Sequence, residues 1–451
     1  MTPLPTLPSD LPAASEEARL PKGFRAAGTR AGIKTSGGPD LGIVVVVGPP
    51  AAVAATFTTN RMPAAPVLLD REHLLATDPT GAGRRGWVKA MMSTSGCANA
   101  ATGSPGMADQ RELAACLAAA AGTDPTHVLM LSTGLIGTRL PVDRIRAVLE
   151  ATVSAELRAE DEAFRAVAQA LRTTDSRVKA ASLSVTLPGP GEEPVNVTVS
   201  GVAKGVGMIH PSMATMLCLM LTDATAAPDV LEGVLRPIVA RTWDQLSVDG
   251  DQSTNDTVLL AASGASGAAA LVAGSEASAV LARAIEAVAR SLARQQAADG
   301  EGATSLISCG VSGARDDIDA RAVARAVVGS NLVKAAIHGA DPNWGRIAAA
   351  AGNAVVASAA VLEAAGLGAE AARARSGRPV ELDPERLQID LQGTPVFAAT
   401  PLAFEASDLS ASMRGGEVRI RIDLGLGEGS GEAFGCDLTE AYVIENSAYS
   451  T

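Results

Sequence analysis

Residues 204–221 read KGVGMIHPSMATMLCLML, and the fold is organised around this stretch. Its second part, Met216–Leu221, is a continuous apolar run bounded by Thr222 and Asp223, which is typical of a strand buried on both faces. Its first part, residues 204–215, is a glycine-rich loop with one proline that leads directly into that strand. The stretch therefore predicts a buried central strand with a constrained loop at its entry.

On either side of this stretch, short β-rich runs alternate with Ala-rich helical runs, which indicates a mixed α/β fold. Asp143 and Gly122 fit the chemistry of a helix start and a helix stop. Residues 363–386 are charged and interrupted by Gly and Pro, so we expect a loop or linker there. The other predicted strands are Ile43–Val47, Trp87–Met92, Val128–Leu131, Ser182–Leu187, Val195–Val199, Thr257–Ala262, Ser305–Cys309 and Val418–Ile422. The predicted helices are Ala108–Ala121, Val142–Val153, Val230–Thr242, Glu276–Gln296 and Ala320–Val328.

The length and composition of the chain indicate how many domains to expect and which partners to exclude. A chain of 451 residues is longer than one ordinary domain, so we expect two or three domains. With a formal net charge of -12 and 2% aromatic residues, the chain lacks what phosphate contacts and base stacking require. We therefore expect no nucleic-acid partner. Apolar runs too short for a membrane span, no signal pattern and five widely spaced cysteines indicate a soluble, cytoplasmic protein without a membrane partner.

The loop of residues 204–215 ends on a threonine, Thr215, at the strand entry. Composition alone favours an ordinary loop-to-strand connection. In the alternative, the Thr215 hydroxyl attacks the preceding carbonyl, the Ala214–Thr215 bond is cut, and Thr215 becomes a new N-terminus. Its freed α-amine would then serve as the base for its own hydroxyl, and desolvation would lower the pKa of that amine. The periodicity of the sequence does not decide between these two interpretations.

A second candidate feature is the run Ser132–Gly137, which follows the predicted strand Val128–Leu131. A Gly-containing turn after a strand can direct a backbone N–H and a hydroxyl toward one point, as an oxyanion hole requires. Taken alone, the run is better interpreted as a simple turn.

Other patterns point to no cofactor or metal. Residues 81–86 fit GxGxxG, but a strand follows where a dinucleotide site needs a helix. Asp249-Gly250-Asp251 resembles the start of a calcium loop, but Thr254 and Leu260 stand where the loop needs Gly and Glu. The four histidines do not pair at metal-ligand spacing. We therefore expect neither a metal nor a cofactor.

An ordered series of motifs resembles the glutamate N-acetyltransferase/ornithine acetyltransferase family of arginine biosynthesis. The resemblance runs from Gly23 to the C-terminus. The motifs are residues 23–28 (GFRAAG), 31–34 (AGIK), 58–61 (TTNR), 132–134 (STG), 173–175 (TTD), 204–215, 249–257 (DGDQSTNDT), 300–304 (GEGAT), 339–346 (GADPNWGR), 435–439 (GCDLT) and 446–451.

This resemblance implies an N-terminal-nucleophile-type fold with αββα layers, cleaved by its own Thr215 into an α chain (1–214) and a β chain (215–451). The β chain would end in a smaller α/β domain from about residue 320, and the chains would assemble as α2β2. Thr215 would move an acetyl group from N2-acetylornithine to glutamate by a ping-pong reaction, and acetyl-CoA is a second donor in some members. Thr133 and Gly134 would form the oxyanion hole. The implied substrate contacts are Thr173, Lys204, Thr215, Glu301, Asn446 and Thr451.

Departures from the usual family motifs leave alternatives open. They lie at Thr94, Cys97, Val206, Ser212 and Ser305, around the expected substrate pocket. The chain could therefore be a paralogue that acts on another acyl amino acid in secondary metabolism. It could also be an N-terminal-nucleophile aminopeptidase, in which water attacks the acyl-enzyme. A third alternative is a processed but inactive scaffold.

Overall fold

Strand β9 (Leu217–Thr222) lies inside a six-stranded sheet, and each of its residues is buried. Cys218 and Met220 pack into one hydrophobic core, whereas Leu217, Leu219 and Leu221 pack into another on the opposite face. The prediction of a strand buried on both faces is therefore confirmed. The computed structural model describes residue 4 and residues 11–210 and 216–447, so Ala214, Thr215 and Thr451 lie outside the described residues.

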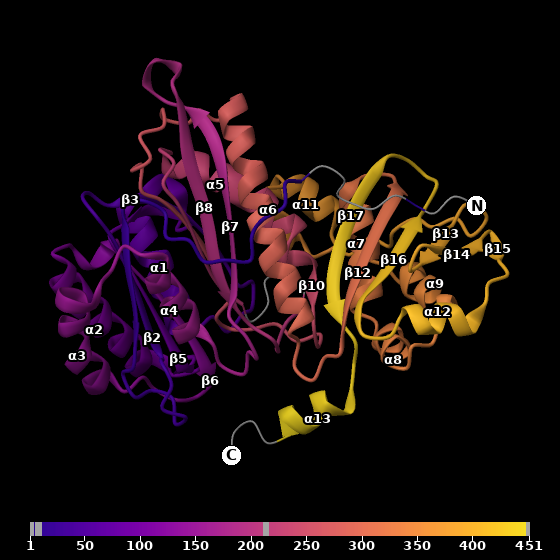
Figure 1. The fold of residues 1–451 in the computed structure, drawn as a ribbon, viewed down its shortest axis with the longest axis horizontal. Helices are drawn as coiled ribbons and strands as arrows, with labels where there is room; N and C mark the ends of the chain where they lie inside the picture. The colour runs from indigo at the N-terminus through magenta and orange to yellow at the C-terminus, as the bar shows by residue number, and fades with distance from the viewer. Residues whose placement is uncertain (1–3, 5–10, 211–215, 448–451) are drawn as a thin grey trace.

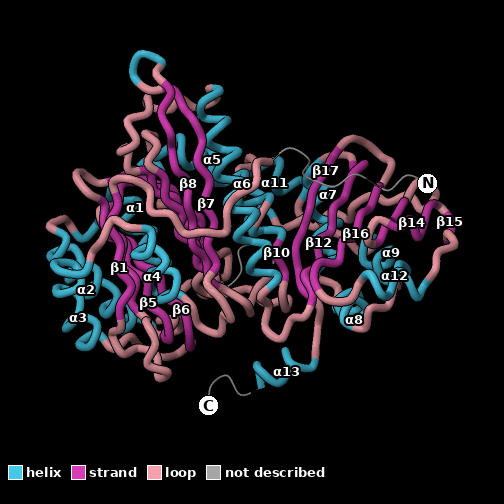
Figure 2. The backbone as a smooth tube through the Cα atoms, viewed as in Figure 1, coloured by secondary structure: helices cyan, strands magenta, loops and turns pink. Residues whose placement is uncertain are grey.

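The described strands form three sheets, which Figure 2 shows as separate groups. The six-stranded sheet has the order β4-β3-β11-β9-β8-β7, with β9 and β11 parallel and the other pairs antiparallel. Its remaining strands are β3 (Ala51–Phe57), β4 (Arg85–Val88), β7 (Lys179–Pro188), β8 (Pro194–Lys204) and β11 (Thr257–Ala262).

The four-stranded sheet has the order β1-β2-β5-β6, and β5 and β6 run parallel. It consists of β1 (Phe24–Thr29), β2 (Leu41–Val46), β5 (Ala90–Cys97) and β6 (Val128–Leu135). One face packs on α1 (Ala65–Thr77), α2 (Gly103–Ala121) and α3 (Val142–Ala151). The other face packs toward the six-stranded sheet, with α4 (Asp161–Leu171) contributing to the shared core.

The far face of the six-stranded sheet packs on α5 (Pro228–Arg241) and α6 (Glu276–Ala298). The order helices, sheet, sheet, helices is visible in Figure 1. It confirms the predicted α/β class with αββα layers.

A seven-stranded sheet lies beyond α6, which contacts both this sheet and the six-stranded one (Figure 1). Its strands, in sheet order, are β10 (Leu246–Ser247), β17 (Gly429–Cys436), β12 (Ser305–Ala314), β16 (Gly416–Asp423), β13 (Gln388–Leu391), β14 (Thr394–Ala398) and β15 (Thr400–Pro401). The helices of this part of the chain are α7 (Asp317–Val328), α8 (Asn331–His338), α9 (Trp344–Gly352), α10 (Ala359–Ala364), α11 (Ala369–Arg375), α12 (Ala406–Ser412) and α13 (Glu440–Ser447).

Three local predictions were wrong. The predicted strand Trp87–Met92 is two strands, because the chain passes at Lys89 from β4 in the six-stranded sheet to β5 in the four-stranded sheet. No Gly or Pro separates them, so the sequence has no break at this point. The predicted linker 363–386 contains α11 and the end of α10. Asp143 lies in the first turn of α3, whose N-cap is Pro141, whereas Gly122 is the left-handed C-cap expected of α2.

The Ala-rich strand β3 and the helix α4 are further elements that the pattern analysis did not predict. The described helices include no segment with both the length and the apolar character needed to cross a membrane.

Candidate active site

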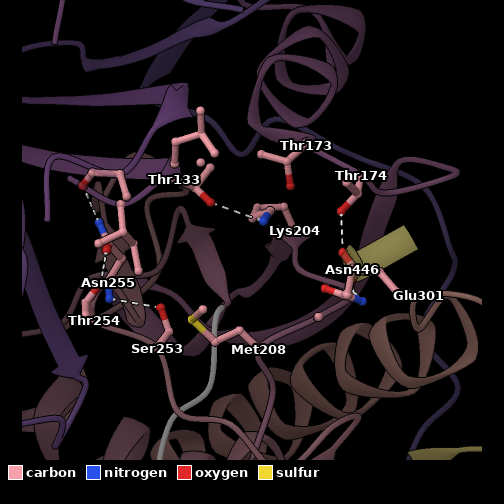
Figure 3. Close-up of a pocket in the computed structure, with 15 residues that line it drawn as sticks. Thr133, Thr173, Thr174, Lys204, Met208, Ser253, Thr254, Asn255, Glu301 and Asn446 are labelled. Carbon is pink, nitrogen blue, oxygen red and sulfur yellow. Dashed lines mark hydrogen bonds between the residues drawn. The ribbon is translucent and has the colours of Figure 1, made fainter. Parts of the chain in front are cut away.

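One cavity of about 390 Å³ brings together predicted site residues from distant parts of the chain (Figure 3). Thr133 and Gly134 lie near the end of β6, Lys204 ends β8, and Glu301 follows α6. All six predicted site residues that the structure describes line this cavity: Thr133, Gly134, Thr173, Lys204, Glu301 and Asn446. Their roles remain predictions, and Ala214, Thr215 and Thr451 are outside the described residues.

Gly134 occupies a backbone position that only glycine fits. Its φ is 127°, a conformation that L side chains rarely adopt. A Cβ built on it would lie 2.3 Å from the carbonyl carbon of Gly96, because β5 and β6 approach closely where Gly96 pairs with Gly134. The close approach directs the Thr133–Gly134 segment into the cavity at the irregular end of the parallel pair.

Lys204 places a cation in the wall of the cavity. The residue is only 3% exposed, and its Nζ donates a hydrogen bond to Thr133 Oγ1 at 3.2 Å. Gln296 Nε2 donates to the Lys204 carbonyl oxygen at 2.8 Å, which fixes the backbone at the end of β8. Burial lowers the pKa of the Lys204 ammonium, while the nearby carboxylates of Asp175, Glu301 and Asp256 act to raise it.

Glu301 contributes the opposite charge to the same cavity. Its Oε1 accepts a hydrogen bond from Thr174 Oγ1, and its Oε2 accepts one from Asn446 Nδ2, both at 2.9 Å. The carboxylate packs over Gly207, where a Cβ would lie 2.2 Å from Oε2. The cavity thus presents a buried ammonium and a carboxylate held by neutral donors, an arrangement suited to a zwitterionic ligand.

The segment 253–256 also contributes to the site, although no sequence pattern predicted a role for it. Ser253, Thr254 and Asn255 line the cavity. Asn255 Nδ2 donates to the carbonyl oxygens of Ala98 and Ser132 at 2.7 and 2.8 Å, which ties this segment to the end of β6. The only signal for it in the sequence was the motif at 249–257, which carried the family resemblance without indicating a function.

Asp256 is a buried carboxylate beside the entry of β9. Its Oδ1 accepts a hydrogen bond from the Met216 backbone N–H at 3.0 Å. Its Oδ2 is buried without a hydrogen-bond partner among the described residues. Burial raises the pKa of this carboxyl well above its ordinary value. A perturbed acid next to the residue that follows Thr215 is a candidate member of the site.

Residues 11–210 and 216–447 lack the arrangement of side chains that a metal site needs. No group of three or more His, Cys, Asp or Glu side chains there is arranged to hold a metal ion.

Comparison with known proteins identifies the family. The ArgJ family model matches residues 25–451. An arginine biosynthesis bifunctional protein ArgJ from Thermus thermophilus is 42% identical over 433 residues, covering 96% of this chain and 99% of that protein. A solved arginine biosynthesis bifunctional protein from Bacillus halodurans is 36% identical, covers 50% of this chain and 96% of that chain, and superposes with a TM-score of 0.44. A solved ornithine acetyltransferase from Mycobacterium tuberculosis, complexed with ornithine, is 36% identical, covers 44% of this chain and 97% of that chain, and has a TM-score of 0.37. Since the family model spans nearly the whole chain and the Thermus relative is similar over almost its full length, the chain belongs to the ArgJ family.

Proposed function

We propose that this ArgJ-family chain is an acetyltransferase of arginine biosynthesis that moves the acetyl group of N2-acetylornithine to glutamate. The observation that supports the proposal best is the cavity in which Lys204, Glu301 and the adjacent pair Thr133 and Gly134 come together from three separate parts of the chain. The names of the relatives agree with this activity, since they describe arginine biosynthesis proteins and an ornithine acetyltransferase.

In the proposed reaction, Thr215 is the nucleophile. Its Oγ attacks the acetyl carbonyl carbon of N2-acetylornithine, and its α-amine takes the hydroxyl proton and passes it to the leaving nitrogen. The C–N bond breaks and ornithine leaves. The α-amine of glutamate then attacks the Thr215 ester, the C–O bond breaks, Oγ regains a proton, and N-acetylglutamate leaves. Thr133 and Gly134 would stabilise the negative oxygen of each tetrahedral intermediate. These steps use no metal or cofactor.

The charges in the cavity suit both substrates. Lys204 would bind a substrate carboxylate and Glu301 an ammonium group, while Thr173, Asn446 and Thr451 would supply neutral hydrogen bonds. We expect Glu301→Gln to raise the KM for N2-acetylornithine about tenfold or more, since a hydrogen bond to a charged group contributes about 1.5–3 kcal/mol. Steady-state kinetics would check this, and an unchanged KM would remove Glu301 as the ammonium partner.

The nucleophile has to be generated by processing. We propose that cleavage between Ala214 and Thr215 yields an α chain of 214 residues and a β chain of 237 residues, which stay together as α2β2. The same acyl-enzyme could be formed from acetyl-CoA, which would add the amino-acid N-acetyltransferase reaction.

The decisive experiment combines processing with transfer. The purified chain is run on a denaturing gel, the second fragment is sequenced from its N-terminus, and acetyl transfer from N2-acetylornithine is measured with and without glutamate. We expect two fragments, a second fragment beginning Thr215-Met216-Leu217, and glutamate-dependent ornithine release. Thr215→Ala should abolish both cleavage and transfer, whereas Thr186→Ala, on the exposed face of β7, should change neither.

Each other result excludes part of the proposal. A single uncut chain, or a different second N-terminus, would contradict the role of Thr215. Release of acetate without glutamate would identify a hydrolase. Transfer from another acyl amino acid, but not from N2-acetylornithine, would identify a paralogue with a different substrate.

A further inference from the structure

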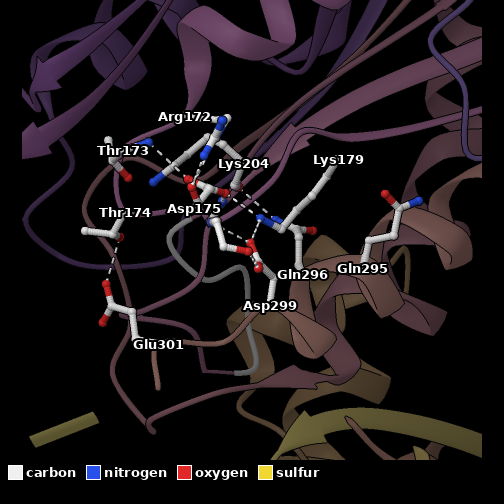
Figure 4. Close-up of polar contacts among 12 residues, drawn as sticks. Arg172, Thr173, Thr174, Asp175, Lys179, Lys204, Gln295, Gln296, Asp299 and Glu301 are labelled. Atoms are coloured by element: carbon white, nitrogen blue, oxygen red, sulfur yellow. Dashed lines mark hydrogen bonds and ion pairs between the residues drawn. The ribbon is translucent and has the colours of Figure 1, made fainter. Parts of the chain in front are cut away.

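Asp175 lies next to the cavity but is absent from its lining, and it holds three segments together (Figure 4). The residue is 3% exposed and lies between α4 and β7. Its Oδ1 accepts hydrogen bonds from Lys179 Nζ at 2.6 Å and from the Gly205 backbone N–H at 2.9 Å. Its Oδ2 accepts one from the Thr173 backbone N–H at 3.0 Å. One carboxylate therefore fixes the backbone beside both Thr173 and Lys204.

Lys179 extends this network toward Glu301. Its side chain is fully buried, and its Nζ also lies 2.5 Å from Asp299 Oδ2. Asp299 accepts a further hydrogen bond from the Ser176 backbone N–H at 3.1 Å and stands two residues before Glu301. The chain of contacts Asp175–Lys179–Asp299 thus connects the loop after α4, the end of β8 and the end of α6 (Figure 4).

Asp175 and Asp299 both pair with Lys179, but they differ in their relation to Lys204. The charged groups that act most strongly on Lys204 include the carboxylates of Asp175, Glu301 and Asp256 and the ammonium group of Lys179, and Lys34 is a further cation that interacts with it. Among these carboxylates Asp175 has the largest influence, whereas the close ionic contact of Asp299 is with Lys179. Burial alone would raise the pKa of Asp175, but Lys204, Lys179 and the Gly205 N–H outweigh burial and lower it to about 2. Asp175 therefore stays ionised throughout the neutral range.

We infer that Asp175 is a positioning residue that keeps the side chain of Lys204 in its ammonium form for a substrate carboxylate. The inference rests on the proposed function only in assigning the carboxylate to Lys204. A buried lysine without a compensating charge tends to lose its proton, and a neutral amine binds a carboxylate weakly. Asp175 supplies the compensating charge, and because its own oxygens are occupied by Lys179 and two backbone N–H groups, it leaves Lys204 Nζ directed at the cavity.

The test compares two isosteric variants of the same ion-pair network, Asp175→Asn and Asp299→Asn. The chain has six lysines, so selective 13C labelling of lysine side chains allows each to be titrated by NMR, and Lys204→Met identifies the Lys204 signal. We expect Asp175→Asn to lower the titration midpoint of Lys204 by at least about 1 pH unit, as loss of a close opposite charge does. Asp299→Asn should lower that midpoint less, because the close partner of Asp299 is Lys179. This readout does not depend on enzymatic activity.

Binding of ornithine, measured by calorimetry at pH 6.5 and pH 8.5, shows the consequence for the substrate. In Asp175→Asn the loss of affinity should be larger at pH 8.5 than at pH 6.5, because a lowered midpoint reduces the charged fraction of Lys204 more at the higher pH. Lys204→Met should bind weakly at both pH values, and Asp299→Asn should show a pH dependence closer to that of the unsubstituted chain than Asp175→Asn does. Asp175→Glu, which keeps the charge, should preserve the Lys204 midpoint and also keeps the test informative if Asp175→Asn does not fold.

Two outcomes would overturn the inference. In the first, folded Asp175→Asn keeps the Lys204 titration midpoint of the unsubstituted chain. Asp175→Asn and Asp299→Asn also lose affinity for ornithine by the same factor at both pH values. Asp175 would then be a structural ion-pair partner only. The other is a Lys204 midpoint that falls in Asp175→Glu although its charge is retained. If the unsubstituted chain bound no ornithine, the proposed function would fail, while the lysine titration would still decide the role of Asp175.

Discussion

Two regions of the molecule each bury a lysine, and they use it differently. Lys204 borders the cavity and Lys334 lies on α8 beside the seven-stranded sheet, with exposures of 3% and 1%. Burial lowers the pKa of both ammonium groups. Lys334 Nζ donates to the carbonyl oxygens of Cys436 at 2.6 Å and Ser247 at 3.4 Å, so it ties α8 to β17 and β10. Lys204 Nζ donates to Thr133 Oγ1 at 3.2 Å and faces the cavity.

The carboxylates of the two regions differ in the partners that hold them. Glu432 on β17 is neutralised by Arg290, with contacts of 2.5 and 2.8 Å. Glu301 in the cavity accepts hydrogen bonds from the neutral side chains of Thr174 and Asn446. A buried charge by itself therefore does not indicate a binding site. What distinguishes the cavity is that Lys204 and Glu301 line it and remain available to a ligand.

The largest effect should come from adding a methyl group to a glycine in each region. Gly134→Ala should lower transfer by at least about 100-fold, the effect of losing one oxyanion donor, because its Cβ would lie 2.3 Å from the Gly96 carbonyl carbon. The matched variant is Gly393→Ala in the β13–β14 turn, where φ is also positive (79°) but no atom lies within 4 Å of the added Cβ. It should cost about 1 kcal/mol of stability and leave transfer unchanged. Kinetics and thermal unfolding of both variants would check this, and equal losses of activity would contradict the proposed oxyanion hole.

A smaller effect is expected from replacing each lysine by methionine. Lys204→Met should raise the KM for the amino-acid substrates about 10- to 100-fold with little loss of stability, because a hydrogen bond to a charged group contributes about 1.5–3 kcal/mol. Lys334→Met should leave the KM unchanged and lower the free energy of unfolding by about 1–3 kcal/mol, since two buried carbonyl groups lose their donor. A variant of Lys334 that is stable but impaired in substrate binding would contradict the distinction between the two regions.

The smallest effect concerns pH and the ion pairs of the seven-stranded sheet. Glu417 Oε1 accepts hydrogen bonds from Arg294 at 3.0 Å and Ser308 at 2.7 Å. Burial opposes ionisation of Glu417, but Arg294 and Ser308 outweigh it and lower its pKa from 4.5 to about 2. A lowered pKa in the folded state stabilises the fold above the unfolded-state pKa, and this stabilisation is lost as the pH falls toward 2. The stability advantage of the unsubstituted chain over Glu417→Gln should therefore shrink between pH 6 and pH 3 in urea unfolding, with transfer kinetics unaffected. A constant difference across this range would show that the charge of Glu417 is not the cause.

Local sequence patterns predicted much of the fold. The run Thr257–Ala262 was predicted with the bounds that β11 has, and the apolar run after Thr215 predicted β9 within one residue. Patterns failed where the tertiary environment overrides local preference. Strand β3, AAVAATF, has an alanine-rich composition that suits a helix, yet all seven of its residues are buried in the six-stranded sheet. The passage from β4 to β5 left no mark in the sequence because the residues on both sides of Lys89 are apolar and Lys89 alone separates the two strands.

The sequence predicted some residues of the candidate site and missed others. The family motifs identified Thr133, Gly134, Thr173, Lys204, Glu301 and Asn446, which the structure brings to one cavity. Composition and spacing alone would not have grouped them, because their segments are far apart in the chain. Asp175 and Asn255 stood in the same motifs, but their hydrogen bonds with Gly205, Ala98 and Ser132 reach backbone groups of other segments, which no local pattern records.

The amino-acid sequence by itself determined the α/β class, the buried strand after Thr215 and the family. Each of these depends on neighbours in the chain or on an ordered set of motifs. Only the tertiary structure decided which buried charges face a cavity and which are neutralised by partners. The physical reason is that the ionisation of a buried group such as Lys204 depends on the distances to Asp175, Glu301 and Asp256, and these distances exist only once three distant segments have packed together.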